Sequence, residues 1–256
     1  MNKNIVIVFM CCGLLLLSCK SKDIFIAPKD EERDRLLVDA IISQEDYSIK
    51  TRDEAISFYK AKGVSLYFEG NDRLRSFDSS RPCGLIDGDL KFLRFFPEVS
   101  GVHLSDREIT DSVFYFLKDL KNISAISLYN TKVTGEGFRF LLDKNKLIIF
   151  DFNGSPIDDN GLKYLSLINY SDKVLILNLS GSKITDNGME YISRINFGKG
   201  RINLSKTSVS DRGIRFLEKF KELTEINLLY TNVSQQGAMW LKSKFPDADV
   251  QWGEPR

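Results

Sequence analysis

Few side chains in this chain of 256 residues could support chemistry. It contains one histidine, His103, which lies between Val102 and Leu104 in an alternating apolar segment. An imidazole acts as a general base or metal ligand only beside a placed nucleophile, carboxylate or second ligand, and the sequence indicates none there. A P-loop, a nucleophile elbow, a paired-cysteine motif and an H-E-x-x-H motif are also missing. We therefore expect a protein that is not an enzyme and that holds no cofactor and no metal.

Cys19 has the clearest chemical signature of the four cysteines. It follows the 13-residue apolar run Ile5–Leu17, which is too short to span a bilayer and is typical of a signal peptide. The run ends in Leu16–Cys19 (LLSC), which resembles a bacterial lipobox. We therefore expect residues 1–18 to be a lipoprotein signal peptide and an acylated Cys19 to anchor the chain in a lipid bilayer. The alternative is an ordinary signal peptide with incidental cysteines.

The residue after the lipidated cysteine helps to predict which membrane holds the protein. It holds Lys20, where a signal for retention in the inner membrane usually shows aspartate. We therefore expect a place in the bacterial cell envelope, at the outer membrane or cell surface in preference to the inner membrane.

The charge balance argues against a nucleic-acid partner. Lysine and arginine number 36 and aspartate and glutamate 35, so removal of Lys3 with the signal peptide leaves a mature chain without net charge. Cys83 would then be the only thiol besides Cys19. Neither a disulfide within the chain nor a metal site built of cysteines is possible.

One short phrase recurs six times, and its copies begin 24, 24, 27, 25 and 24 residues apart. A period in this range is typical of a solenoid of stacked strand-plus-helix units. Apolar residues two positions apart open each unit as a strand, and an isoleucine or valine five positions later returns the chain to the same core. The copies are Leu104–Val113, Leu128–Gly137, Phe152–Gly161, Leu179–Gly188, Leu204–Gly213 and Leu228–Gly237.

Each copy predicts a short helix. The residue after the isoleucine or valine is a good N-cap, and the fourth and seventh positions from it are apolar and share one helix face. The predicted caps are Thr110, Thr134, Asp158, Thr185, Ser210 and Ser234. The sixth position is always aromatic, which we interpret as packing between neighbouring helices, with a binding stripe as the alternative: Phe116, Phe140, Tyr164, Tyr191, Phe216 and Trp240.

The pattern L-x-x-[TS]-x-[IV]-[TSD]-[DG]-x-G resembles leucine-rich repeats, most closely the cysteine-containing subtype found in many bacterial repeat proteins. The resemblance implies an α/β solenoid with a curved parallel sheet inside, helices outside and a small helical N-terminal cap. It covers six repeats over residues 99–244, and residues 245–256 resemble a C-terminal cap strand with a tail. The cysteine position of the subtype holds Asp106 or Arg107 in the first repeat and hydroxyl residues that can still bond backbone in the others: Thr131, Ser155, Ser182, Thr207 and Thr231.

The segment before the repeats divides into a tether and a cap. Residues 19–29 are expected to be a lipidated tether, and residues 30–98 a helical N-terminal region with a capping repeat. Asp30–Ser43 and Thr51–Lys62 have helical patterns, and Glu54 completes a capping box with Thr51. Val64, Leu66 and Phe68 alternate like a repeat strand and residues 87–96 like a repeat helix, so we expect an irregular insertion at residues 70–84 between them.

The outward strand positions form columns across the concave face, where partners of such folds usually dock. The middle column, which includes His103, is polar throughout, so it is either a ladder of cross-strand hydrogen bonds or part of a binding surface. Apolar Tyr129, Ile149, Ile176 and Leu229 on the same face are the better indication of a site. The predicted partner-binding residues are Tyr129, Ile149, Asp151, Ile176, Asn178, Arg201, Asn203, Glu225, Asn227 and Leu229.

The sequence therefore predicts a membrane-anchored, non-catalytic module that recognises a protein on its concave face. One alternative is a structural or scaffold lipoprotein of the envelope without a specific ligand. The other is an enzyme with a site in the insertion at residues 70–84, which rests on no positive observation.

Overall fold

The structure is a computed structural model that describes residues 49–70, 72–79, 83–105 and 108–253. The predicted signal peptide, Cys19, the tether and the helix expected at 30–43 lie outside the described residues. Within these ranges no helix is long and apolar enough to cross a membrane.

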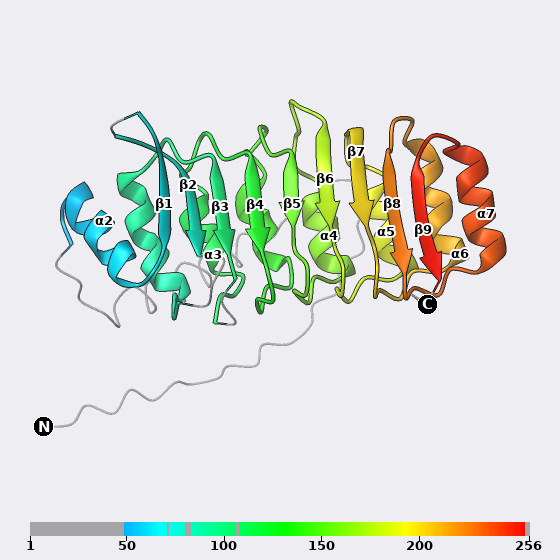
Figure 1. The fold of residues 1–256 in the computed structure, drawn as a ribbon, viewed down its shortest axis with the longest axis horizontal. Helices are drawn as coiled ribbons and strands as arrows, with labels where there is room; N and C mark the ends of the chain where they lie inside the picture. The colour runs from blue at the N-terminus through cyan, green and yellow to red at the C-terminus, as the bar shows by residue number, and fades with distance from the viewer. Residues whose placement is uncertain (1–48, 71, 80–82, 106–107, 254–256) are drawn as a thin grey trace, which may run out of the picture.

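The described chain forms one nine-stranded sheet in which the strands follow one another in sequence order (Figure 1). The first pair of strands is antiparallel, and every later pair is parallel. The predicted cap strand near the C-terminus is present as the last strand and pairs with the sixth repeat. The strands are β1 Ser65–Glu69, β2 Arg73–Ser79, β3 Gly101–Leu104, β4 Ala125–Leu128, β5 Ile149–Asp151, β6 Val174–Asn178, β7 Phe197–Asn203, β8 Glu225–Leu229 and β9 Asp249–Gly253.

The helices gather on one side of the sheet and leave its other side open (Figure 1). We call the uncovered side the open face; it is the side predicted from the sequence to be concave. The helices are α2 Arg52–Ala61, η1 Asp87–Phe95, α3 Val113–Leu117, η2 Glu136–Leu141, α4 Asp159–Leu165, α5 Asp186–Ile192, α6 Asp211–Ile214, η3 Arg215–Lys219 and α7 Gln235–Lys244, with 3₁₀ geometry in η1, η2 and η3.

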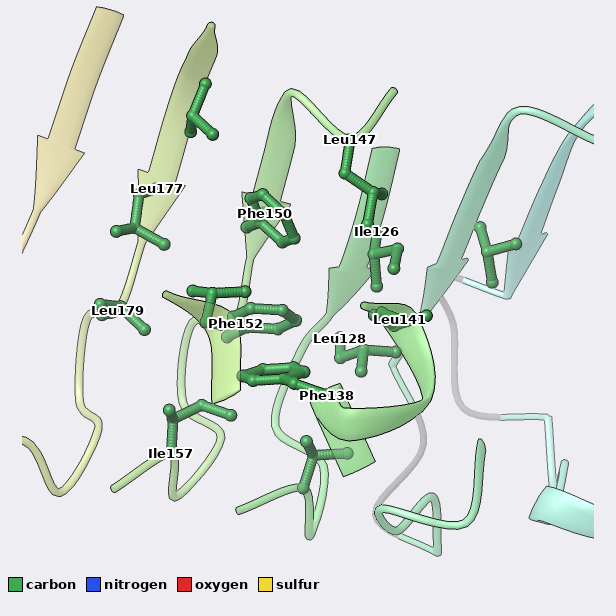
Figure 2. Close-up of a cluster of buried hydrophobic side chains, with 14 of the residues drawn as sticks. Ile126, Leu128, Phe138, Leu141, Leu147, Phe150, Phe152, Ile157, Leu177 and Leu179 are labelled. Carbon is green, nitrogen blue, oxygen red and sulfur yellow. The ribbon is translucent and has the colours of Figure 1, made fainter. Parts of the chain in front are cut away.

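Side chains that alternate along the strands form the core between sheet and helices. In the central repeats Ile126, Phe150 and Leu177 are neighbours across three strands, and all are fully buried. Figure 2 shows Phe138 of η2 reaching this layer beside Phe152, with 5.0 Å between ring centroids. Each such side chain contributes about 1.5–3 kcal/mol on burial, so stacking supplies the apolar contacts that no single repeat could make.

Helix caps follow the prediction in four of the six repeats. The side chains of Asp158, Thr185, Ser210 and Ser234 each accept a hydrogen bond from a first-turn amide. In the first repeat regular helix begins only at Val113, although Thr110 Oγ1 accepts the amide of Ser112 at 3.3 Å. In the second repeat the prediction is wrong, because helix begins at Glu136 after Gly135 and has no side-chain cap. In both repeats Thr110 and Thr134 donate their hydroxyl groups to aspartates of the preceding unit.

These contacts belong to a ladder of aspartates that links consecutive units. The carboxylate after a cap accepts both the amide and the hydroxyl of the next cap residue; for example, Asp186 accepts from Ser210 N and Oγ at 2.7 and 2.6 Å. Hydrogen bonds to ionised carboxylates are about twice as strong as neutral ones, so the ladder stabilises the stacking of units. Its members are Asp87, Asp111, Asp159, Asp186 and Asp211.

The ladder is interrupted between the second and third repeats, where Gly135 replaces the aspartate and Asp158 replaces the hydroxyl cap. The second repeat has Gly135 where the first, third, fourth and fifth repeats have aspartate. The next cap is Asp158, whose ionised side chain, unlike a hydroxyl group, cannot donate a hydrogen bond to a carboxylate. A Cβ at Gly135 would lie 2.7 Å from the Cα of Gly161. The amide of Asp158 instead donates to the carbonyl of Thr134 at 3.1 Å. Close backbone approach therefore replaces the carboxylate bridge at this junction.

The N-terminal unit confirms one prediction and corrects another. Helix α2 carries the expected capping box between Thr51 and Glu54. However, residues 70–84 are not an irregular insertion, because β2 lies within them and its Leu74 and Phe77 are fully buried. The predicted repeat strand is β1, which pairs antiparallel with β2 and so forms the outer half of a hairpin. The strand that continues the parallel array is β2.

The aromatic residues predicted between the helices pack as expected. Phe116 is buried, and the other five are partly buried against the core. The ring of Tyr115 meets the rings of both Phe116 and Phe140 edge-on, with centroids 5.7 Å apart in each pair. The guanidinium of Arg215 lies 4.0 Å from the ring of Trp240. These contacts favour the packing interpretation over a binding stripe.

Candidate functional site on the open sheet face

The strand register brings the predicted columns together on the open face. Ile149 pairs with Ile176, and Arg201 pairs with Glu225, in one column. The polar column runs through His103, Ser127, Asp151, Asn178, Asn203 and Asn227, which are paired from strand to strand. It extends beyond the prediction to Asp78 on β2 and Gln251 on β9.

The polar column is partly structural. Each of Asn178, Asn203 and Asn227 accepts the backbone N–H two residues further on, at 3.0–3.1 Å. Asp151 does the same with Asn153 N at 3.3 Å. These bonds close the turn at the end of each strand, as asparagine and aspartate do in Asx turns. They use the oxygen of each asparagine side chain and leave the amide N–H groups of Asn178 and Asn203 as donors toward a ligand.

A hollow of about 270 Å³ lies over the centre of the open face. We call it the central hollow. It contains apolar, amide and oppositely charged side chains within one cavity. The reason is that the polar column there lies beside the column that holds Ile176, Arg201 and Glu225. Seven of the ten predicted binding residues line it: Tyr129, Asp151, Ile176, Asn178, Arg201, Asn203 and Glu225.

A second hollow of about 550 Å³ lies toward the N-terminal end of the face, and we call it the histidine hollow. Nδ1 of its His103 lies 2.9 Å from Oγ of Ser127. Sequence analysis missed this hollow because it treated His103 as a lone surface residue. Its lining residues are Asp78, His103, Leu104, Ser105, Ser127, Tyr129, Asn130 and Asp151.

Tyr129 and Asp151 line both hollows. The phenol of Tyr129 donates to Oδ2 of Asp151 at 2.9 Å, and the tyrosine is 37 % exposed. Partial burial, followed by the hydrogen bond to Asp151, raises the pKa of Tyr129 above its ordinary value. The phenol therefore remains a donor at neutral pH and fixes the carboxylate between the two hollows.

The apolar residues predicted as one cluster are divided by the structure. Ile149 and Ile176 are register neighbours and half-buried on the open face, and Ile176 also lines the central hollow. Tyr129, directly after β4, lines that hollow as well. Leu229 lies on β8, where it pairs with Gly253 of β9, and Asn227 donates to Gln251 at 3.1 Å. Leu229 and Asn227 therefore belong to the C-terminal end of the face.

A third hollow of about 310 Å³ lies where β6 and β7 begin. Its Lys173 pairs with Glu222 at 2.9 Å, and Phe197 and Phe220 lie with ring centroids 5.0 Å apart. None of the predicted binding residues lines it. Among the described residues no group of three or more histidine, cysteine, aspartate or glutamate side chains could hold a metal ion. The open face therefore has the better-supported candidate site.

Comparison with known proteins supports the repeat assignment. Residues 171–193, which include β6 and α5, match the family described as Leucine Rich repeat. The fold is a leucine-rich-repeat solenoid. Among solved structures, an internalin from Listeria monocytogenes is similar to this chain, with 14 % identity and a TM-score of 0.47. That match covers 64 % of this chain and 50 % of the internalin, so the chain spans half of the internalin's length. No curated protein matches the sequence.

The hydroxyl residues at the cysteine position of the subtype can be compared with the predicted bonding to backbone. At the subtype's cysteine position, Thr207 and Thr231 donate to the carbonyls of Leu204 and Leu228, at 2.6 and 2.7 Å. Ser155 donates to the carbonyl of Leu128 at 2.8 Å. The hydroxyl of Ser182 is buried without a hydrogen-bond partner. Thr131 Oγ1 accepts the backbone amide of Val133 at 3.4 Å. The predicted bonding of backbone from this turn therefore holds at four of the five positions, and Ser182 departs from it.

Proposed function

We propose that the leucine-rich-repeat array is a non-catalytic recognition module that binds a protein partner on its open face. The observation that carries this proposal is the central hollow, where seven of the predicted residues converge. Leucine-rich repeats commonly serve as protein-interaction modules, which supports the class of function.

The chemistry of the hollow suits a polypeptide surface. Ile176 and its neighbour Ile149 supply apolar area, and Arg201 and Glu225 supply charges of both signs. The amide groups of Asn178 and Asn203 add hydrogen-bond donors at the floor. Interfaces combine an apolar centre with a polar rim in this way, and a standard interface buries about 800 Å² on each partner.

A photocrosslinking residue tests the proposal in the cells that produce the protein. At exposed position 201 it would face the central hollow, and at position 239 it would replace Met239, which is 62 % exposed on α7. We expect a discrete protein adduct from position 201 that is missing from position 239. Adducts from position 239 alone, or from neither position, would contradict binding on the open face.

We further propose that lipidation of Cys19 anchors the module in a bacterial envelope, at the outer membrane or cell surface. The apolar run before LLSC and the lysine at position 20 support this proposal. We expect Cys19→Ala to abolish acyl labelling and to release the protein from the membrane fraction, because stable anchoring needs two or more acyl chains. An unchanged membrane fraction in this variant would contradict the anchor.

A further inference from the structure

The last strand of the sheet has an unpaired edge (Figure 1). Strand β9 pairs with β8 on one side, and no strand among the described residues pairs with its other side. Asp249 donates its amide to the carbonyl of the residue before β8, and the carbonyl of Gly253 accepts from the residue after β8, at 2.9 and 3.1 Å. Backbone groups along a strand point alternately to its two sides, so those of Val250 and Trp252 point away from β8. Their two N–H and two C=O groups are therefore available to another strand.

The two ends of the sheet differ in how they treat their edges. The register of β1 shifts within the strand, and its Glu69 forms ion pairs with Arg73 and Arg75 of β2. Bulges and charged side chains are devices by which edge strands avoid pairing with other chains. In contrast, β9 pairs with β8 along its whole length without a register shift, and its only charged residue is Asp249 at its first position. Of the two edges, that of β9 is therefore the one suited to pairing.

We propose that β9 pairs antiparallel with β9 of a second copy of this chain, so that the two sheets continue into each other across a twofold axis. The free backbone groups determine the register. In an antiparallel ladder a hydrogen-bonded pair exchanges two bonds, so both of its residues need free groups. With Val250 opposite Trp252 of the second copy, and Trp252 opposite Val250, all the free groups are used. The twofold axis then passes beside Gln251, which lies opposite its own counterpart.

The side chains of β9 are self-complementary in this register. Val250 and Trp252 pair with buried residues of β8 and so point to the same side of the sheet; Val250 is half-buried and Trp252 is 40 % exposed. Each tryptophan would lie opposite a valine, and cross-strand pairs of an aromatic with a β-branched residue are favourable. Asp249 would lie opposite Gly253, which keeps the like charges of the two copies apart. Symmetry supplies this match from the chain's own sequence, which favours a second copy over an unrelated strand.

Pairing at this edge would join the open faces of two molecules. The polar column reaches Gln251 on β9, so it would continue without interruption into the column of the second copy. Contacts between two single strands are smaller than a standard interface, which buries about 800 Å² on each partner. We therefore expect a dimer that dissociates on dilution.

A disulfide across the twofold axis tests the register. Gln251→Cys would place two cysteines opposite each other in a non-hydrogen-bonded pair, where Cα atoms are about 4.5 Å apart and a disulfide can form. The mature chain is extracted from membranes into detergent micelles, with Cys83→Ala as the background because Cys83 is a free thiol. We expect mild oxidation to link Gln251→Cys into a dimer of the chain and to leave the background protein monomeric.

The matched control uses the same strand. Asp249→Cys is exposed at the same edge, but its counterpart would lie opposite Gly253, so the two cysteines would be too far apart to link. Random collision, or pairing in another register, would link both cysteine variants. Equal linkage of Asp249→Cys and Gln251→Cys would therefore overturn the inference, and so would linkage of Gln251→Cys to a different protein.

A proline at the edge tests the backbone bonds. Val250→Pro removes an N–H that points away from β8, so the bonds to β8 stay and two bonds of the dimer are lost. Each lost bond weakens association by about fivefold, so the dissociation constant of the dimer should rise by about 25-fold in analytical ultracentrifugation. If Val250→Pro melts at a lower temperature than the parent, Trp252→Lys provides the second test, because it removes the apolar pair and keeps the backbone. A chain that is monomeric at every concentration, or a dimer that neither variant weakens, would contradict pairing through β9.

Discussion

The double substitution Ile149→Lys and Ile176→Lys is expected to abolish the protein adduct from position 201 while the melting temperature changes by only a few degrees. The two isoleucines are register neighbours on the open face and are only half-buried, so their loss removes interface area without opening a cavity in the core. Two lysines at directly paired positions also repel each other and any basic segment of a partner. Crosslinking yield and a thermal melt of the same preparation measure the two effects.

The matched control places two lysines elsewhere on the surface. Gln236 and Met239 are both exposed on α7, on the helix side of the sheet, and neither lines the hollows of the open face. Gln236→Lys with Met239→Lys adds the same charge and should leave the adduct intact. If the isoleucine double variant unfolds, the two residues act as core. If the isoleucine double variant forms the protein adduct with the same yield as the parent protein, the site lies outside the central hollow.

The sequence predicts the array because the same physical constraint repeats in every unit. A strand with one buried face needs apolar residues at alternate positions, and Ile126, Phe150 and Leu177 satisfy this in successive repeats. Their spacing along the chain then fixes which outward residues become neighbours. The pairs Ile149–Ile176 and Arg201–Glu225 follow from the period alone.

The hollows do not follow from the period, because their depth depends on the sizes of adjacent side chains. Gly101, next to His103 on β3, and Ser127 are small, and Tyr129 directly after the strand of Ser127 is large, so the face is recessed beside the tyrosine. The prediction ranked residues by polarity and missed this difference in size. The contrast between a glycine in one column and a tyrosine in another is visible in the sequence and could have indicated the histidine hollow.

The hairpin β1–β2 was missed for a different reason. Residues 70–84 are mostly polar, and the buried residues of β2, Leu74 and Phe77, are three positions apart instead of two. A register irregularity between Tyr67 and Phe68 of β1 accompanies this spacing. A bulge of this kind interrupts the alternation on which strand prediction depends. The strand is therefore evident from its pairing with β1 and β3.

The aspartate ladder was visible in the sequence as a repeated residue, but its partners were not. Asp159 lies in the first turn of its own helix, but its carboxylate accepts the amide and hydroxyl of Thr185 in the next repeat. Local sequence patterns describe contacts within one unit. Contacts about 26 residues away become evident only when the units are stacked.

Asp111→Ala is expected to lower the free energy of unfolding by about 3 kcal/mol, the upper range for hydrogen bonds to a charged group. Asp111 accepts four hydrogen bonds at the junction of the first two repeats, from Thr134 N and Oγ1 and from the amides of Gly135 and Gly137, at 2.8–3.0 Å. Gly135 is the N-cap of η2 and Gly137 lies in its first turn. Because η2 has no side-chain cap of its own, no other side chain replaces the lost acceptor. Urea denaturation measures the change.

Two further variants distinguish the loss of hydrogen bonds at this junction from a general effect of removing a negative charge. Asp111→Asn keeps an oxygen for the amides of Gly135 and Gly137 but loses the acceptor for Thr134, so an intermediate loss is expected. Asp119→Ala removes an exposed carboxylate from the same repeat and should change stability by less than about 0.5 kcal/mol. Because each solenoid unit contacts only its neighbours, hydrogen exchange in Asp111→Ala should accelerate most on both sides of this junction. Equal losses from Asp111→Ala and Asp119→Ala, or uniform acceleration along the array, would show that the ladder does not couple the repeats.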